Sequence, residues 1–155
     1  ESLLRMVADE LPNFNDVNVA TAFSKLGKLC GSWSFPHNIE GDDKFRGLML
    51  RARVMCAEGE LKAQAVANAS HALAKMSAAG KLATNDADVQ GTLVALENRA
   101  VLVVSDMKPQ EVANFIWSHA TLGRMPGSEA WAALETAVTR VGPEMKPQDV
   151  AMTIW

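Results

Sequence analysis

The sequence has no tyrosine and only two cysteines, and aromatic residues make up 6% of its 155 residues. Cys30 and Cys56 form no CxxC pair, so we expect buried or loop thiols rather than a redox or metal site. No apolar run approaches the roughly 18 to 20 residues that cross a membrane, and no signal peptide is visible. Apolar residues still make up 48% of the chain, which favours small-residue packing between helices.

Sequence patterns of catalysis are also missing. His37, His71 and His119 form no HxxxH or HExxH spacing, and no glycine-rich phosphate loop is present. The acidic pairs at 42–43 and 86–88 lie at loop or helix-start positions, where carboxylates favour the helix dipole. We therefore predict no enzymatic activity, no metal and no cofactor in this segment.

The most informative pattern that is present is an internal repeat. The segment Met107–Trp117 returns as Met145–Trp155, a spacing of 38 residues (145 minus 107). The residues before each copy repeat at the same distance, as Val94–Glu97 and Ala132–Glu135. A fixed period of about 20 to 50 residues indicates stacked units that bury their apolar faces against each other. The sequence therefore predicts an all-α fold, an α-solenoid of tandem helix-turn-helix repeats.

Two weaker copies extend the array toward the N-terminus. Leu61–Asn68 aligns with Met107–Asn114 at 46 residues, and Leu11 aligns with Leu61 at 50. The longer spacings imply insertions near 31–43 and 81–88, which helical repeats tolerate because closure entropy grows slowly with loop length. Since the first and last units are incomplete, we expect the segment to belong to a longer array. The predicted units are 1–10 (partial), 11–60, 61–106, 107–144 and 145–155 (partial).

Proline and glycine mark the expected helix ends. Pro109 and Pro147 suit the first turn of a helix, where a missing N–H costs nothing. Gly27 and Gly123 suit the left-handed residue at a helix end, and the second helix of a unit should stop before Gly142. We expect the helices to bury an apolar face against the stack. The residues assigned to this core include Trp117, Trp131, Trp155, His71 and His119.

Polar residues recur in register and are the candidate site. Lysine and glutamine recur at the start of the first helix of each unit, and asparagine recurs one turn further on. A ladder of ammonium groups could follow a phosphate backbone, and a ladder of amides could bond successive base edges. The candidate RNA-binding residues are Lys62, Lys108, Lys146, Gln64, Gln110, Gln148, Asn18, Asn68 and Asn114, with a short further ladder of Lys25 and Lys75.

A structural interpretation of the same residues stays open. Lysine and glutamine at a helix start are often only solvated, and asparagine in the first helix could brace the neighbouring repeat. The net charge of −3 and a pI near 5.6 also lack the basic excess of a typical nucleic-acid binder.

The segment 107–123, with its return after 38 residues, resembles the octotricopeptide repeat, whose units carry Pro-Gln, Ala-Asn and Trp-Ala elements. The resemblance implies a paired-helix superhelix that binds RNA in a mitochondrion or plastid and acts in transcript maturation, stability or translation. It also implies a second possibility, a scaffold that binds mainly protein in a large assembly such as a mitochondrial ribosome. The aromatic insertion at 31–37 favours protein docking, whereas a regular lysine ladder favours RNA.

Overall fold

The computed structural model describes residues 2–154, which form eight α-helices and contain no strand. The predicted all-α class is confirmed. Short 3-10 turns precede or follow several helices, as at Val104–Asp106 and Gly142–Glu144. The helices are α1 (Ser2–Glu10), α2 (Asp16–Leu29), α3 (Asp43–Ala57), α4 (Ala63–Ala78), α5 (Ala87–Val103), α6 (Pro109–Thr121), α7 (Ser128–Val141) and α8 (Pro147–Ile154).

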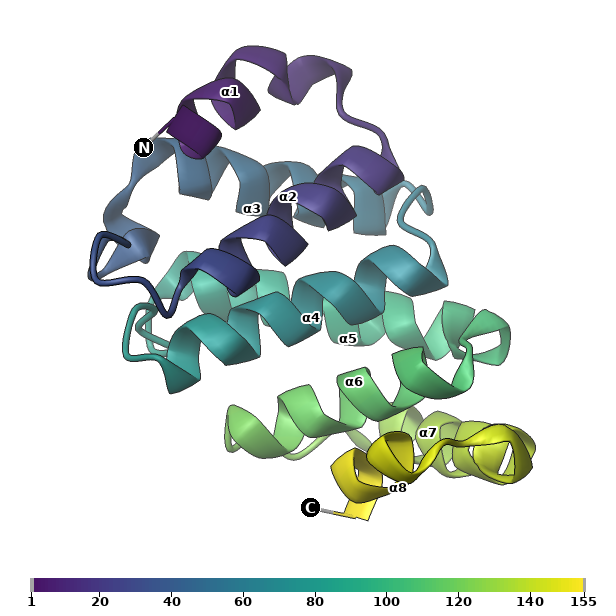
Figure 1. Cartoon of the computed structure of the whole chain (residues 1–155). Helices are drawn as coiled ribbons and strands as arrows, with labels where there is room; N and C mark the ends of the chain where they lie inside the picture. The colour runs from purple at the N-terminus through teal and green to yellow at the C-terminus, as the bar shows by residue number, and fades with distance from the viewer. Residues whose placement is uncertain (1, 155) are drawn as a thin grey trace.

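The helices stack in two layers. Helices α2, α4, α6 and α8 pack in that order and form one layer, which we call the A layer. Helices α1, α3, α5 and α7 pack in the same way and form the B layer. Figure 1 looks onto the A layer, with α3 and α5 behind α2 and α4. The A helices α2, α4 and α6 are each followed in the chain by a B helix, which is the arrangement of the predicted solenoid.

Helix starts fix the register of the units and correct one alignment. The residues that precede α2, α4 and α6 as N-caps are Asn15, Lys62 and Lys108. The first two lie 47 residues apart (62 minus 15), so the predicted offset of 50, which paired Leu11 with Leu61, is wrong by three residues. The cause is the Asn15 cap, which starts α2 later than the sequence pattern suggested.

The corrected register places a valine at the fourth residue of α2, α4 and α6. Val19, Val66 and Val112 are equivalent, and each is fully buried. Gly27 then lies inside α2 rather than at its end, which corrects the prediction for that glycine. A Cβ on Gly27 would lie 3.1 Å from the Cα of Ala72. This glycine therefore permits α2 and α4 to approach closely.

Other predicted helix ends are confirmed. α6 and α8 begin at Pro109 and Pro147. α6 ends just before Gly123, whose φ is +64°, and α7 ends at Val141, directly before Gly142.

In α3, α5 and α7 an arginine binds the backbone just before the A helix of the same unit. Arg51 donates to the carbonyl oxygen of Phe14 at 2.9 Å, and Arg99 donates to that of Leu61 at 2.7 Å. The third member of the set is Arg140, which donates to the carbonyl oxygen of Met107 at 2.9 Å. All three acceptors directly precede the N-cap of an A helix. These contacts lie within a unit, and we call them the arginine clamp.

The insertion after α2 braces the loop after α4. The Ile39 N–H donates to the carbonyl oxygen of Lys81 at 3.0 Å, and Lys81 Nζ donates to the carbonyl oxygen of Phe35 at 3.3 Å. The Ala83 N–H donates to the buried carboxylate of Glu40 at 3.1 Å. The insertion is therefore an ordered part of the stack.

The tryptophans are less buried than predicted. Trp131 is 49% exposed, so its assignment to the core is wrong. Trp117 is half-buried, and Trp155 lies outside the described residues. His119 is buried as predicted. The position of α5 that the 38-residue period pairs with Trp131 is Leu93, which is 5% exposed.

Candidate nucleic-acid interface

Helix α4 is the most enclosed helix of the array, and its solvent-exposed side is narrow. It packs against α2 on one side, α6 on the other and α5 behind. Between Ala65 and Met76 every residue is buried except Asn68, His71 and Lys75. These three residues are spaced by three and four, so they lie on one helix face. α4 therefore presents to solvent an amide, an imidazole and an ammonium group.

The same face continues onto α6. Asn114, Trp117 and Thr121 stand 46 residues after Asn68, His71 and Lys75, which is the separation of the two N-caps (108 minus 62). Gln64 and Gln110 extend both rows by one turn and are exposed. In α2 the equivalent positions are occupied by Val17, Thr21, Ser24 and Lys28. We call the rows of α2, α4 and α6 together the outer stripe.

A contact between aromatic rings joins the rows of α4 and α6. The rings of His71 and Trp117 have centroids 5.0 Å apart and an interplanar angle of 58°. Both side chains are half-buried, so part of each ring remains accessible. Such a pair offers a π surface on which a nucleobase could stack.

The imidazole of this pair is kept neutral by its surroundings. Burial lowers the pKa of His71 below its ordinary value of 6.5, and the nearby Lys75 ammonium lowers it further. A neutral ring keeps one N–H donor and one acceptor nitrogen. His71 can therefore hydrogen-bond a base edge in either direction at neutral pH.

The local charge of α2, α4 and α6 differs from the net charge of the chain. Helices α2, α4 and α6 contain three lysines, Lys25, Lys28 and Lys75, and two acidic residues, Asp16 and Glu111. The balance of these helices is +1 (three minus two), whereas the chain carries −3. The Glu111 carboxylate also accepts a hydrogen bond from the Lys108 N–H at 3.0 Å. The acidic excess therefore lies outside these three A helices.

The predicted lysine ladder lies at the N-terminal end of the stripe. Lys62 and Lys108 are the N-caps of α4 and α6, Lys146 precedes α8, and all three are exposed. An exposed acid stands two residues before each lysine. These acids are Glu60, Asp106 and Glu144. Any phosphate that follows the lysines therefore passes a carboxylate at every step.

The structure brings some predicted residues together and separates others. Asn68 is half-buried in the outer stripe, whereas Asn114 is 8% exposed and mostly covered by the stack. Asn18 is not their equivalent: its side chain accepts from the Asn15 N–H at 3.0 Å and caps α2. Lys25 is exposed on α2, but Lys28 stands at the position of Lys75. Gln148 is exposed at the start of α8.

The sequence-based site missed His71 and Trp117, because both were assigned to the core. Their recurrence at one repeat position was visible, but the exposure of that position was not. An apolar or aromatic residue at helical spacing can lie on the covered face or on the exposed face of its helix. Only the packing of neighbouring helices decides between the two.

Residues 2–154 contain no candidate metal centre and no candidate membrane span. No group of three or more His, Cys, Asp or Glu side chains among them is placed to hold a metal ion. No helix in this range has the length and apolar character that a membrane span requires. Burial raises the pKa of the Cys56 thiol to about 11, against a smaller lowering by Arg99. That thiol is protonated at neutral pH and is a poor nucleophile.

Comparison with known proteins gives one family. Residues 43–155 match the family described as Tbc2 translation factor, N-terminal domain. The match begins at the first residue of α3 and covers most of the chain, and the chain belongs to this family. No curated protein matches the chain, and no solved structure matches it. The family connects this helical repeat to translation.

Proposed function

We propose that this member of the Tbc2 translation factor N-terminal domain family binds single-stranded RNA along the outer stripe of its A layer. The observation that carries the proposal is the face of α4, where Asn68, His71 and Lys75 are the accessible residues between Ala65 and Met76. The adjoining His71 and Trp117 rings add a stacking surface. Amide, stacking and ammonium groups are the three chemistries with which proteins hold unpaired RNA.

Each residue has a distinct role in the proposal. His71 and Trp117 stack a base, the Asn68 amide bonds a base edge, and the ammonium group of Lys75 pairs with a phosphate. Lys62, Lys108 and Lys146 provide further phosphate contacts at the helix starts. The mostly covered Asn114 braces the stack.

The family and the resemblance to octotricopeptide repeats support a biological setting for this binding. The protein acts without catalysis in an organelle, a mitochondrion or a plastid, where it directs the translation, maturation or stability of a transcript or organises ribosomal RNA. The neutral His71 supports recognition of bases, because its donor and acceptor nitrogens match the polar edges of unpaired bases.

The test is binding of a fluorescent, random-sequence, 20-nucleotide single-stranded RNA, followed by anisotropy over a range of salt concentrations. The test variant is His71→Ala with Trp117→Leu. The matched control is Trp33→Leu, which removes an indole that is 93% exposed on the insertion loop. Loss of one stacked base weakens binding by about 1 to 3 kcal/mol, or about 5- to 150-fold. Circular dichroism verifies that each variant stays helical.

A second pair of variants tests the phosphate contact. Lys75→Glu should weaken RNA binding and lower the salt slope by about one. Lys44→Glu, in B helix α3, should change neither quantity because Lys44 lies in the other layer. Equal binding by wild type and the stripe variants would contradict the proposal, and so would equal affinity for duplex RNA.

The second candidate is a scaffold that binds mainly protein. Exposed apolar side chains away from the stripe favour it: Trp33 is 93% exposed and Met125 is 81% exposed. Absence of RNA binding by the wild-type chain even at low salt would replace the RNA proposal with this one.

A further inference from the structure

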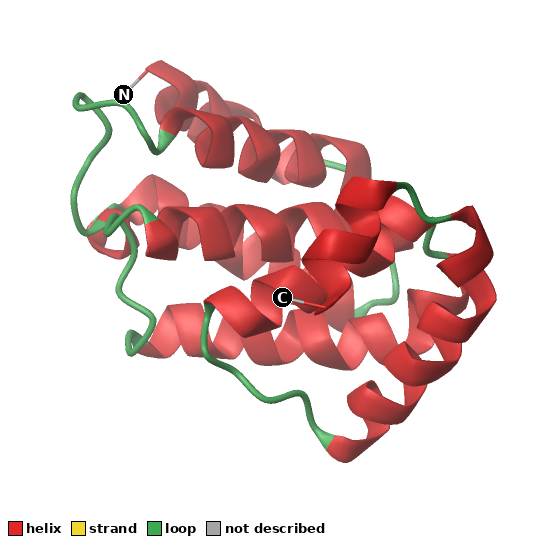
Figure 2. Cartoon of the chain, turned by 60° about the horizontal axis from the view of Figure 1, so that its bottom comes forward, coloured by secondary structure: helices red, strands yellow, loops and turns green. Residues whose placement is uncertain are grey.

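Helices α2 and α4 cross closely near their C-terminal ends. Gly27 lies against Ala72, and a Cβ on this glycine would lie 3.1 Å from the Cα and from the Cβ of Ala72. Side chains next to this contact are therefore brought together across the two helices. Figure 1 shows α2 and α4 side by side, and Figure 2 shows the loops that follow them, in green, on the same side of the molecule. The crossing joins two successive units at one edge of the A layer.

Each helix carries a lysine beside this crossing. Lys28 directly follows Gly27, and Lys75 comes three residues, about one turn, after Ala72. Both lysines lie in the last turn of their helix. They are also equivalent, because they are 47 residues apart (75 minus 28), as are the N-caps of α2 and α4 (62 minus 15). The outer stripe therefore places two ammonium groups on the same side of the crossing.

No carboxylate of the described residues neutralises this lysine pair. Each ion pair within residues 2–154 is made by an arginine or a histidine, and none has a nitrogen of Lys28 or Lys75 within the 4.0 Å limit of a salt bridge. Two acids of the neighbouring loops have other partners. Glu40 accepts from the Ala83 N–H, and Asp86 accepts from two N–H groups at the start of α5. An anion between the two lysines would relieve the repulsion of their like charges.

The helix dipole explains a lysine at the end of each helix but not the pairing of the two. A cation in the last turn of a helix is stabilised by the carbonyl groups there. This effect is the same on any side of the helix. The position of both lysines on the solvent side of one close crossing needs a further reason, and an anionic ligand supplies it.

The lysine pair lies beside the ring pair of the outer stripe. His71 and Lys75 are four residues apart on one face of α4, which separates them by about 6 Å along the helix axis. His71 contacts Trp117 of α6, and Lys28 stands on the other side, on α2. An aromatic surface and a double positive charge therefore adjoin each other on three successive A helices. A nucleotide has the matching parts, a planar base and an anionic phosphate.

The crossing of α4 and α6 has no such lysine pair. Thr121 stands on α6 at the position of Lys75. The next cation along the chain is Arg124, and it donates to Gln90 Oε1 at 2.7 Å. A cation pair is therefore formed at the crossing of α2 and α4 and not at the crossing of α4 and α6.

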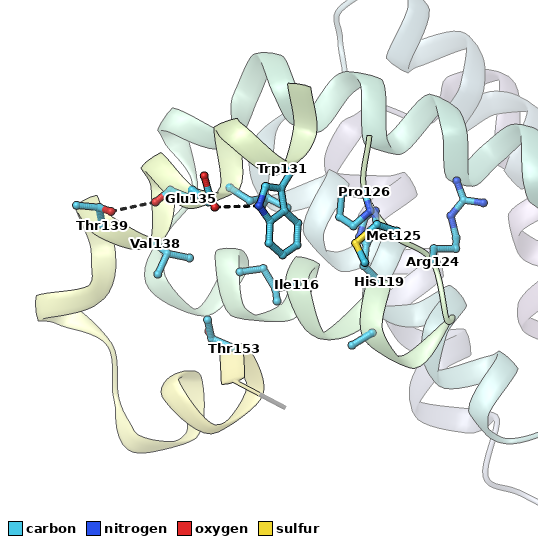
Figure 3. Close-up of a pocket in the computed structure, with 12 residues that line it drawn as sticks. Ile116, His119, Arg124, Met125, Pro126, Trp131, Glu135, Val138, Thr139 and Thr153 are labelled. Carbon is cyan, nitrogen blue, oxygen red and sulfur yellow. Dashed lines mark hydrogen bonds between the residues drawn. The ribbon is translucent and has the colours of Figure 1, made fainter. Parts of the chain in front are cut away.

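Arg124 belongs to a set of contacts that holds two units together. Its Nη2 lies 3.7 Å from the carboxylate of Glu97 on α5. The same carboxylate accepts from the Gly127 N–H at 2.8 Å, and His119 Nε2 lies 3.3 Å from it. Figure 3 shows Arg124 at the margin of a pocket formed by α6, α7 and α8, with its guanidinium group directed away from Trp131. Arg124 therefore serves the connection between units.

We propose that Lys28 and Lys75 together hold one phosphate of the RNA, next to the base that stacks on His71 and Trp117. This inference rests on the proposed RNA binding and adds Lys28 to the site. Gly27 keeps α2 close enough to α4 for both ammonium groups to reach the same phosphate. The lysines at the helix starts differ, because an exposed acid stands two residues before each of them.

The test compares the salt dependence of RNA binding by the full chain and three variants. These variants are Lys28→Glu, Lys75→Glu and the combination of both, and the probe is the 20-nucleotide single-stranded RNA. Either single change places a carboxylate against the shared phosphate, so each should lower the salt slope by about one. The double variant should also lower it by about one, because the two lysines hold a single phosphate.

A second double variant supplies the matched control. Lys62→Glu with Lys75→Glu changes two lysines at opposite ends of α4. These lysines contact separate phosphates in the proposed function, so their effects should add to a slope loss of about two. Circular dichroism verifies that all variants remain helical.

Lysine acetylation gives an independent measurement at the level of single residues. Acetic anhydride modifies accessible lysines, and mass spectrometry gives the rate for each. Saturating RNA should slow acetylation of Lys28 and Lys75 several-fold and should leave Lys44, on B helix α3, unchanged. In the Lys75→Glu variant, saturating RNA should no longer protect Lys28.

The outcomes separate this inference from the proposed function. A slope loss of about two in the variant that combines Lys28→Glu and Lys75→Glu would overturn the shared phosphate and leave RNA binding along the outer stripe intact. Continued protection of Lys28 in the Lys75→Glu variant would do the same. Absence of RNA binding by the wild-type chain would overturn both.

Discussion

The middle unit, α4 and α5, and the last unit, α6 and α7, carry closely related sequences in different surroundings. Leu93 is covered on α5, while its equivalent Trp131 is half exposed on α7. Glu97 holds three donors of the next unit, while Glu135 is held by its own helix. The arginine clamp, in contrast, is present in both. Among the described residues, the two units therefore share the contact within a unit and differ in the surroundings of their B helices.

The largest difference between the two units should come from apolar substitutions. Leu93→Ala should reduce the free energy of unfolding by about 2 to 5 kcal/mol, because it leaves a cavity in a covered site. Trp131→Ala removes a larger side chain but should cost about 1 kcal/mol or less, since half of that side chain is already in water. Urea unfolding measures both. A larger loss of unfolding free energy for Trp131→Ala than for Leu93→Ala would contradict the comparison.

The arginine clamp should show no difference between units. Arg99→Ala and Arg140→Ala should each cost about 1.5 to 3 kcal/mol, because each removes charge-assisted bonds to backbone carbonyls. The measurement is again urea unfolding, with Arg5→Ala on α1 as an exposed control. A negligible cost for Arg140→Ala alone would show that the clamp depends on the next unit.

The carboxylates of Glu97 and Glu135 should differ by a smaller amount. Glu97→Ala should cost about 1 to 3 kcal/mol because it leaves the Gly127 N–H and His119 without their acceptor. Glu135→Ala should change the free energy of unfolding by no more than about 0.5 kcal/mol, as for other exposed positions. Thermal unfolding of both variants beside wild type decides the matter. Similar costs would mean that Glu97 does not connect the units.

The smallest expected effect is a pH dependence confined to the middle unit. The pKa of His71 is lowered in the folded state, so the unfolded chain binds this proton more readily. The resulting loss of stability should begin as pH falls through about 6.5, the ordinary value, and should be complete below the folded pKa. His71→Gln should lose this part of the pH dependence. An identical pH profile for wild type and His71→Gln would contradict the assignment.

The sequence predicted the fold well because the relevant signals are local. Proline at a first helical turn and glycine at a helix end act through backbone geometry, so Pro109 and Gly123 were interpretable without knowing their neighbours. The register of the first unit could not be predicted in this way, because the Asn15 cap that starts α2 is a contact that a repeat alignment does not contain.

The site was predicted only in part for a different reason. Lys75 and Asn68 were found because polar residues in register stand out in a sequence. His71 and Trp117 were placed in the core because an aromatic residue at helical spacing does not reveal which face is covered. The arginine clamp was missed because its members are separated by 48 and 41 residues (99 minus 51 and 140 minus 99) rather than by one period.

The most direct test of the central claim is photocrosslinking of single-stranded RNA that contains 4-thiouridine, followed by mass spectrometric mapping of the adducts. Binding along the outer stripe predicts adducts in the peptides of α4 and α6 that contain His71 and Trp117, with loss of the first when His71 is changed to alanine. Adducts restricted to the B helices α3, α5 and α7 would contradict the account.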